Sequence, residues 1–190
     1  MKLKTKLIVL AGVVFLMMPV SSFALVDVNA YLGYTVGGSW NNLDVKMKGK
    51  DLRYGFSAHL NGDFLVFLKL GIGGYYQGSS VTYKATDNFT VDKQALGLDF
   101  YAMLNLPMMP LSPYVKYNTA AWNKLKFHNH SRRDHFKRHG FGLGAAFTLL
   151  PVPAVMNLQV FGEYVYAFGK EAKEDSQEHQ INIGIRADFL

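Results

Sequence analysis

The segment INIGIRADFL, residues 181–190, decides the fold class of this chain. Its odd-numbered positions hold Ile, Ile, Ile, Ala and Phe, and four of its five even-numbered positions hold Asn, Gly, Arg and Asp. An alternation with a period of two is typical of a β-strand that has one apolar and one polar face. The segment therefore predicts a strand whose apolar face needs an apolar environment.

Seven earlier segments repeat this alternation. They lie at residues 26–36, 52–60, 66–73, 96–106, 114–122, 140–149 and 158–166. No charged residue stands on the apolar face of any segment, as expected for a face in lipid, where Arg or Lys at the bilayer midplane costs about 2–4 kcal/mol. The fifth segment is the least regular, and its alternation places Trp122 on the polar face. The pattern predicts an all-β fold, an eight-stranded antiparallel up-and-down transmembrane β-barrel.

The connections between the segments alternate in length. Short, turn-like connections lie at residues 61–63, 107–113 and 151–153, and longer polar ones lie at 41–50, 77–92, 123–138 and 169–178. Short turns at one end and long loops at the other are typical of outer-membrane barrels. With eight strands, both chain ends then fall at the short-turn, periplasmic end.

The N-terminus has the plan of a secretory signal peptide. Lys2, Lys4 and Lys6 precede an apolar run of 12 residues, and Ser22–Ala24 forms an A-x-A-like cleavage site. The run is shorter than the roughly 20 residues that a membrane-spanning helix needs; a retained N-terminal anchor is the alternative. We expect residues 1–24 to be removed and residues 25–190 to form one barrel domain.

Charge and cysteine content exclude several function classes. The formal net charge is +6 at pH 7, and the signal lysines carry half of it, so no nucleic-acid partner is expected. The chain has no cysteine, which excludes disulfides, thiol catalysis and a lipid-modified cysteine. No segment after the signal is apolar enough for a transmembrane helix, so any span must be made of strands. No cofactor is expected.

The polar face of the predicted barrel carries a balanced set of charges. It holds four acids, four bases and one histidine: Asp27, Arg53, His59, Lys69, Asp99, Lys116, Glu163, Arg186 and Asp188. An eight-stranded barrel has room inside for little more than its own side chains, and buried charges persist only when paired. We predict a salt-bridged interior without an open pore. The expected pairs are Lys69–Asp99, Arg186–Asp27 and Arg53–Glu163.

A soluble sandwich or lipocalin-like barrel, with the apolar face inward, is the alternative. The many glycines on the polar face argue against it, because glycine weakens a strand but leaves room inside a narrow barrel for long side chains opposite. Aromatic residues near the strand ends favour membrane girdles. These are Trp40, Tyr54, Tyr75, Tyr76, Tyr117, Trp122, Tyr166, Phe168 and Phe189.

Over residues 26–190 the chain resembles the small OmpA/OmpX-type outer-membrane barrels. Its last strand looks like the segment that such proteins present to the barrel-assembly machinery. The residues of this assembly signal are Ile185, Ala187, Phe189 and Leu190. The family's terminal aromatic is displaced, because phenylalanine is penultimate and leucine is last. The resemblance implies a structural, adhesive or small-permeation role in the outer membrane.

The predicted loop 123–138 is strongly basic. Against a single aspartate it holds Lys124, Lys126, His128, His130, Arg132, Arg133, His135, Lys137 and Arg138. Such a loop can bind phosphates of lipopolysaccharide or a sulfated host polysaccharide through charge-assisted hydrogen bonds. A solvated loop, neutralised by the acidic neighbour at 169–178, is the alternative.

Two chemical readings of this loop are weaker. Its imidazoles suit zinc, copper or nickel, but their spacing matches no closed structural site; a pH-dependent loop charge is the other reading. The pair His130-Ser131 invites comparison with outer-membrane lipid A deacylases, which use a Ser-His-Glu arrangement. The order differs here, and no glutamate follows in residues 140–149. We expect neither a metal site nor a catalytic site.

The sequence thus predicts a non-enzymatic, surface-exposed, monomeric protein of the bacterial outer membrane. Its expected partners are outer-membrane lipid and lipopolysaccharide, the barrel-assembly machinery, and a host or surface polyanion. A narrow channel for small or apolar solutes is the second reading. A lipid A hydrolase centred on Ser131 is the third.

Overall fold

A computed structural model describes most of the chain after residue 24. The described residues are 25–40, 45–46, 51–65, 67–83, 89–105, 109–127, 133–134, 136–152, 156–171 and 174–189. The predicted signal peptide, residues 1–24, lies outside them, as do Ser131 and Leu190. No helix in the described part is long and apolar enough to cross a membrane.

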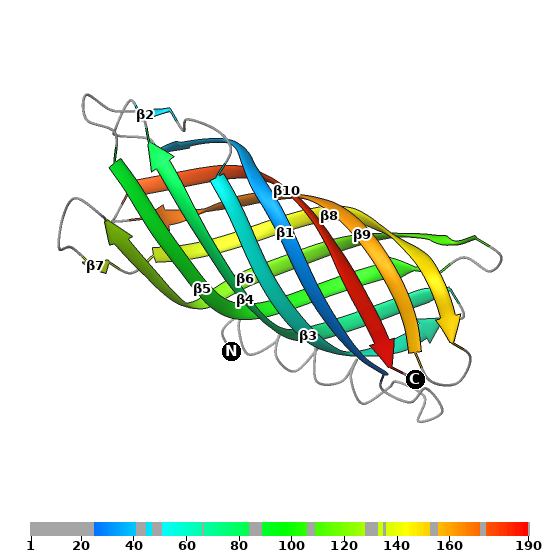
Figure 1. Cartoon of the computed structure of the whole chain (residues 1–190). Coiled ribbons are helices and arrows are strands. Elements are labelled where there is room, and N and C mark those ends of the chain that lie inside the picture. Colours follow the sequence, from blue (N-terminus) through cyan, green and yellow to red (C-terminus); the bar gives the residue numbers. More distant parts are fainter. Residues whose placement is uncertain are drawn as a thin grey trace, which may run out of the picture.

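Eight long antiparallel strands form the body of the molecule (Figure 1). They are β1 (Leu25–Trp40), β3 (Asp51–Leu65), β4 (Leu68–Tyr83), β5 (Phe89–Leu104), β6 (Leu111–Phe127), β8 (Phe136–Val152), β9 (Met156–Glu171) and β10 (Glu174–Phe189). Two short strands, β2 (Val45–Lys46) and β7 (Arg133–Asp134), pair with β1 and β6.

The sheet closes on itself. Strand β10 pairs with β9 on one side and with β1 on the other, from Val26 opposite Phe189 to Trp40 opposite Ser176. Closure removes the sheet edges, which a membrane-spanning sheet requires because lipid cannot satisfy free backbone groups. The predicted fold class is confirmed.

The side chains divide between two faces as the alternation predicts. Leu32 and Ile183 point outward and are 60% and 69% exposed, whereas Asp27 and Arg53 point inward and are fully buried. Large apolar side chains therefore cover the outside of the barrel, and polar ones fill the inside. The lipocalin-like alternative is wrong, because it requires the opposite arrangement.

The two ends of the barrel differ. Strands β2 and β7 lie at the end away from the last residues of β10 (Figure 1). We call this the distal end. The other, proximal end holds the start of β1 and the end of β10, which pair directly.

The strands extend further toward the distal end than the apolar alternation predicts. The predicted loops 77–92, 123–138 and 169–178 lie largely within strands, which leave only residues 84–88, 128–135 and 172–173 between β4 and β5, β6 and β8, and β9 and β10. Backbone pairing continues where the outer face turns polar, since hydrogen bonding between strands does not depend on which side chains they carry. An apolar pattern marks only the part of a strand that faces apolar surroundings.

A β-bulge explains the irregular fifth segment. Opposite the neighbours Leu96 and Gly97 of β5 stand Trp122 and Ala120, so Ala121 is an extra residue on β6. An extra residue reverses the facing of all that follow it. Trp122 consequently lies on the outer face, 43% exposed; its predicted inward position is wrong.

Glycines on the inner face make room for aromatic rings. The Tyr31 ring occupies the space over Gly55, that of Tyr101 lies over Gly71, that of Tyr114 over Gly144 and that of Phe161 over Gly184. In every case the ring and the glycine are direct partners on neighbouring strands. Tyr75, predicted as a girdle residue, also points inward and is 4% exposed. It is odd-numbered, like the other inward residues of β4, Lys69 and Gln77.

Candidate functional site

All nine charged or imidazole residues predicted for the interior lie on the inner face of the barrel. Eight are buried, and the side chain of Lys116 is 11% exposed. They gather in three groups at successive heights, which we call the proximal, central and distal clusters.

The proximal cluster is built around the carboxylate of Asp27. Its Oδ1 lies 2.7 Å from His59 Nδ1 and accepts a hydrogen bond from Asn29. Its Oδ2 accepts hydrogen bonds from Asn61 and from the Tyr101 hydroxyl. This carboxylate is therefore saturated by hydrogen-bond partners from β1 and β3 and from β5 across the lumen.

Two further carboxylates complete the proximal cluster. The other nitrogen of the His59 ring, Nε2, lies 3.4 Å from Asp99, a distance for charge attraction more than for a hydrogen bond. Lys69 Nζ lies 2.9 Å from Asp188. Because both ring nitrogens of His59 face carboxylates, the doubly protonated imidazolium is the form that satisfies both.

Arg186 joins the proximal cluster to the aromatic rings. Its Nε donates to Asn29 Oδ1 over 2.7 Å. Its guanidinium carbon lies 4.7 Å from the ring centre of Tyr101 and 5.2 Å from that of Tyr114. A guanidinium at these distances from ring faces gains cation–π attraction in addition to its hydrogen bond.

The central cluster is a hydrogen-bonded ion pair. Lys116 Nζ donates to Glu163 Oε1 over 2.6 Å, and Asn182 donates to the same oxygen over 2.9 Å. The Tyr114 hydroxyl donates to the other oxygen over 3.0 Å. Both oxygens of the buried carboxylate are thus bound, as a buried charge requires.

The distal cluster gathers three cations around one carboxylate. Glu178 lies 3.2 Å from Arg53, 2.5 Å from Lys93 and 3.1 Å from Arg138. Gln180 also donates to Glu178, over 2.8 Å. All four charged residues are at most 5% exposed.

Sequence reasoning missed Glu178, Lys93, Arg138 and the buried Asp51 as interior residues. They were assigned to loops, or to no element, because the apolar alternation has ended at their positions. Their positions in the strand nevertheless indicate that they face inward, because side chains at every second residue point to the same face. On β10 Glu178 and the inward Arg186 are both even-numbered, and on β5 Lys93 and the inward Asp99 are both odd-numbered.

The three predicted ion pairs are replaced by others. Lys69 stands opposite Met103, not Asp99, in the register of β4 and β5, and it reaches Asp188 across the lumen. Arg186 stands opposite Asn29 and donates to it, because Asp27 is itself opposite Asp188. Arg53 lies at the distal height of Glu178 and binds it in place of Glu163.

The described interior holds equal numbers of acidic and basic side chains. The acids are Asp27, Asp51, Asp99, Glu163, Glu178 and Asp188, and the bases are Arg53, Lys69, Lys93, Lys116, Arg138 and Arg186. The two signs are unevenly distributed. Acids predominate in the proximal cluster and bases in the distal one, so the charge of His59 helps to balance the proximal side.

The predicted basic loop has a different structure from the one expected. Lys124 and Lys126 lie on β6 and Lys137 on β8, and Arg133 belongs to β7. Arg138 is wrong as a surface contact, because it points into the barrel and binds Glu178. The other predicted members, His128, His130, Arg132 and His135, lie outside the described residues.

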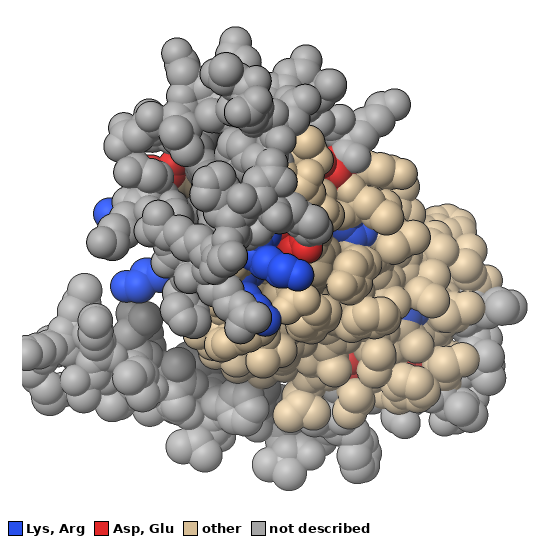
Figure 2. All heavy atoms as spheres, turned by 60° about the vertical axis from the view of Figure 1, so that its left-hand side comes forward, with Lys and Arg blue, Asp and Glu red and all other residues tan. Residues whose placement is uncertain are grey.

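Bases predominate on one side of the distal end, and acids predominate on the other. Four bases stand on β6, β7 and β8, and the acids beside them are Asp134 on β7 and Asp92 on β5, which stands opposite Lys126. On β9 and β10 the acids are Glu171, Glu174 and Asp175, with Lys170 beside them. Figure 2 shows Lys and Arg side chains at this end of the molecule, with Asp and Glu side chains beside them.

A sequence comparison identifies the family. The sequence model of the family described as "Outer membrane protein beta-barrel domain" matches residues 8–189. The chain belongs to this family. This outer-membrane barrel is therefore a protein of the bacterial outer membrane, and the apolar outer face found in the structure is the face that meets the lipid. No curated protein matches the sequence.

Solved structures of similar fold support the architecture of this outer-membrane barrel. Neisserial surface protein A (NspA) has a TM-score of 0.57 and 13% identity, over 85% of this chain and 95% of NspA. Ail of Yersinia pestis, in complex with the heparin analogue sucrose octasulfate, has a TM-score of 0.53 and 14% identity, over 87% of this chain and 99% of Ail. At these identities the likeness concerns the fold.

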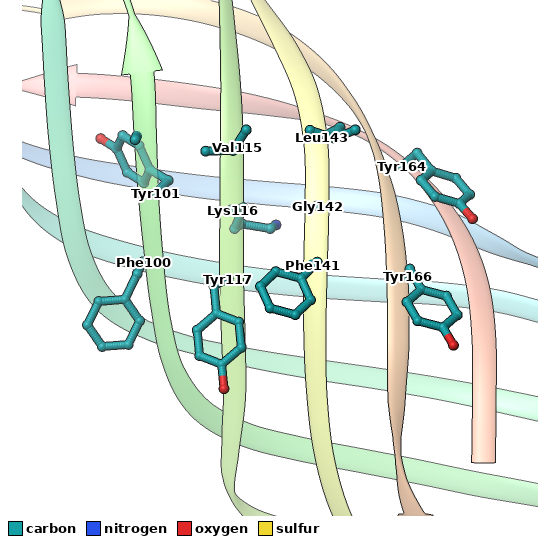
Figure 3. A pocket seen from close by; sticks show the side chains of 11 residues that line it. Phe100, Tyr101, Val115, Lys116, Tyr117, Phe141, Gly142, Leu143, Tyr164 and Tyr166 are labelled. Atoms are coloured by element: carbon teal, nitrogen blue, oxygen red, sulfur yellow. The ribbon is translucent and has the colours of Figure 1, made fainter. Parts of the chain in front are cut away.

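The outer wall of the barrel carries a hollow of about 600 Å³, which we call the lateral hollow. Its walls are almost wholly apolar and come from β5, β6, β8 and β9. The outward side chains that line it include Phe100, Ala102, Tyr117, Phe141, Leu143 and Tyr166. Figure 3 shows the rings of Phe100, Tyr117 and Phe141 side by side on three successive strands.

The described residues of the predicted assembly signal lie on β10. Of the assembly signal, Ile185 and Phe189 face the outside of β10, 54% and 44% exposed, and Ala187 shares their parity. Among the described residues, no group of three or more His, Asp or Glu side chains could hold a metal ion.

Proposed function

We propose that this outer-membrane barrel is a non-enzymatic surface protein that binds polyanions at the basic side of its distal end, with that end facing the cell exterior. The observation that carries the proposal is the excess of cations on one side of this end. Lys124, Lys126, Arg133 and Lys137 stand on three neighbouring strands, where they outnumber the acids Asp92 and Asp134. A concentrated set of cations attracts anions over about a Debye length and binds sulfate or phosphate through charge-assisted hydrogen bonds.

The orientation of Glu178 also supports this proposal. Glu178, an acid of the predicted acidic loop, does not neutralise the surface cations. It is instead turned inward, 2% exposed, and engaged by three interior cations. A barrel of the same fold, Ail, has been crystallised with a sulfated sugar, so this architecture is compatible with a polyanion ligand.

The interior favours a closed barrel over a narrow channel. Ion pairs and rings fill the lumen at three heights, and the inner glycines are covered by Tyr31, Tyr101, Tyr114 and Phe161. We expect no stepwise conductance when the purified protein is reconstituted in a planar bilayer. Reproducible single-channel steps would instead support the channel reading.

Binding of heparin fragments is the test of the polyanion proposal. In the double variant Lys124→Gln/Lys126→Gln, we expect affinity for a size-defined heparin oligosaccharide to fall about three- to tenfold, because each exposed ion pair contributes ~0.2–1 kcal/mol. Fluorescence anisotropy of labelled heparin at low salt measures the affinity. The difference should shrink at high salt, where exposed charges are screened.

The variant Asn105→Asp is the control for net charge, because it also lowers the net charge but stands at the proximal end, between β5 and β6. Its heparin affinity should stay near that of the unmodified protein. Equal losses in the control and in the double variant would show a response to total charge alone, and the proposed basic side would be wrong.

A further inference from the structure

The lateral hollow lies on the face of the barrel that meets lipid. Its outward side chains Leu143 and Phe141 are 64% and 56% exposed, and Val115 is 53% exposed. Ala102, the direct partner of Val115 across β5 and β6, is the smallest of its outward side chains, so its position leaves room in the hollow. Any molecule that fills the hollow must be apolar, because the lining offers almost nothing else.

A continuous row of rings borders the hollow. Phe100, Tyr117, Phe141, Tyr166 and His179 are successive cross-strand partners on β5, β6, β8, β9 and β10. The ring centres of Tyr117 and Phe141 are 5.0 Å apart, and those of Tyr166 and His179 are 5.3 Å apart. Such a row gives an aromatic wall along which an extended hydrocarbon chain can pack.

The outer surface becomes more polar from the hollow toward the distal end. Two residues further along β8 and β9 from Phe141 and Tyr166, the outward partners are His139 and Phe168. After two more residues the outward partners are Lys137 and Lys170. The Tyr117 hydroxyl lies 2.9 Å from His139 Nδ1, so polar groups begin at this height. Since a strand rises about 3.3 Å per residue, the lysines stand roughly 13 Å along the strands from the rings.

We infer that the lateral hollow binds acyl chains of a phosphorylated, multiply acylated lipid of the outer leaflet, whose phosphate contacts Lys137 and Lys170. The order of surfaces matches such a lipid from tail to head: apolar hollow, tyrosine–histidine layer, paired lysines. The two lysines are direct cross-strand partners. Like charges placed opposite each other are unfavourable. Asp175, 4.0 Å from Lys170, offsets part of this cost, and an anion between the two lysines offsets more of it.

The inference rests on the proposed orientation of the distal end toward the cell exterior. Its acyl-chain site lies on the wall of the barrel, whereas its phosphate contact includes Lys137, which also belongs to the basic side. A variant that fills the hollow should therefore leave heparin binding unchanged, which separates a failure of this inference from a failure of the proposed function.

The test fills the hollow without adding polarity. For Ala102→Phe, we expect the affinity for diphosphoryl lipid A to fall about tenfold, equivalent to ~1.4 kcal/mol of binding free energy. Ala58→Phe is the matched control, because Ala58 also faces outward but stands on β3, away from the hollow. Native mass spectrometry of the detergent-purified protein, titrated with lipid, measures retention, and a gel shift on boiling shows that each variant is folded.

The head group is tested with Lys137→Gln/Lys170→Gln. This variant should lose affinity for diphosphoryl lipid A but bind the dephosphorylated form as well as the unmodified protein does. Equal lipid retention by folded Ala102→Phe and the unmodified protein would overturn the acyl-chain site. An equal loss for both lipid forms in the lysine variant would overturn the phosphate contact.

Discussion

Replacing Glu178 by glutamine is expected to lower the free energy of unfolding by about 3–5 kcal/mol, the usual cost of removing one partner from a buried ion pair. Glu178 is the carboxylate that Arg53, Lys93 and Arg138 share, at distances of 3.2, 2.5 and 3.1 Å. The amide keeps the shape of the side chain but removes its charge. Three cations at most 5% exposed then repel one another in the lumen.

The measurement is unfolding by urea of the protein in lipid vesicles, followed by tryptophan fluorescence. Trp122 lies on the outer face and leaves its apolar surroundings on unfolding. The control is Asp175→Asn, which removes the surface ion pair with Lys170, 4.0 Å apart and more than half exposed on both sides. Its effect should stay within about 0.5 kcal/mol. If Glu178→Gln costs no more than this control, the shared carboxylate does not hold the distal cluster together.

The second large effect is expected from Gly71→Leu, which should destabilise the barrel by about 1–3 kcal/mol through overpacking. The Tyr101 ring occupies the space over Gly71. Its hydroxyl donates to Asp27, and its ring face contacts the Arg186 guanidinium at 4.7 Å. A side chain at position 71 displaces the ring, so both contacts are lost together.

The matched control is the same substitution at a glycine that faces outward. Gly162→Leu has nothing within 4 Å of the new Cβ and points toward the lipid. We expect it to be neutral or stabilising, since leucine favours an apolar environment and glycine weakens strands. Equal destabilisation by the two substitutions would mean that loss of glycine itself, and not displacement of Tyr101, is responsible.

Much of the interior could be predicted because a strand's facing is a local property. The alternation assigned Asp27, Glu163 and Arg186 to one face, and the closed barrel puts that face inside. The same parity, continued beyond the apolar segments, would also have found Glu178 and Lys93. These two residues lie where the outer face turns polar, so the apolar alternation does not mark the strand at their positions.

The pairing of the interior charges could not be predicted in the same way. Lys69 reaches Asp188 on β10, a strand far from it in the sequence, because the lumen is narrow enough for contacts between strands that are not neighbours. The bulge at Ala121 had a similar effect on Trp122: one extra residue changed the face, and only the register of β5 with β6 shows it.

The sequence by itself determined the strand type, the number of long strands, the apolar outer face and most of the charges inside. These follow from a period of two, which each segment carries within about ten residues. Only the tertiary structure decided where the strands end, which carboxylate meets which cation, and that Arg138 belongs to the interior while Lys137 remains outside. Those outcomes depend on register, closure and distances across the lumen, which no single segment contains.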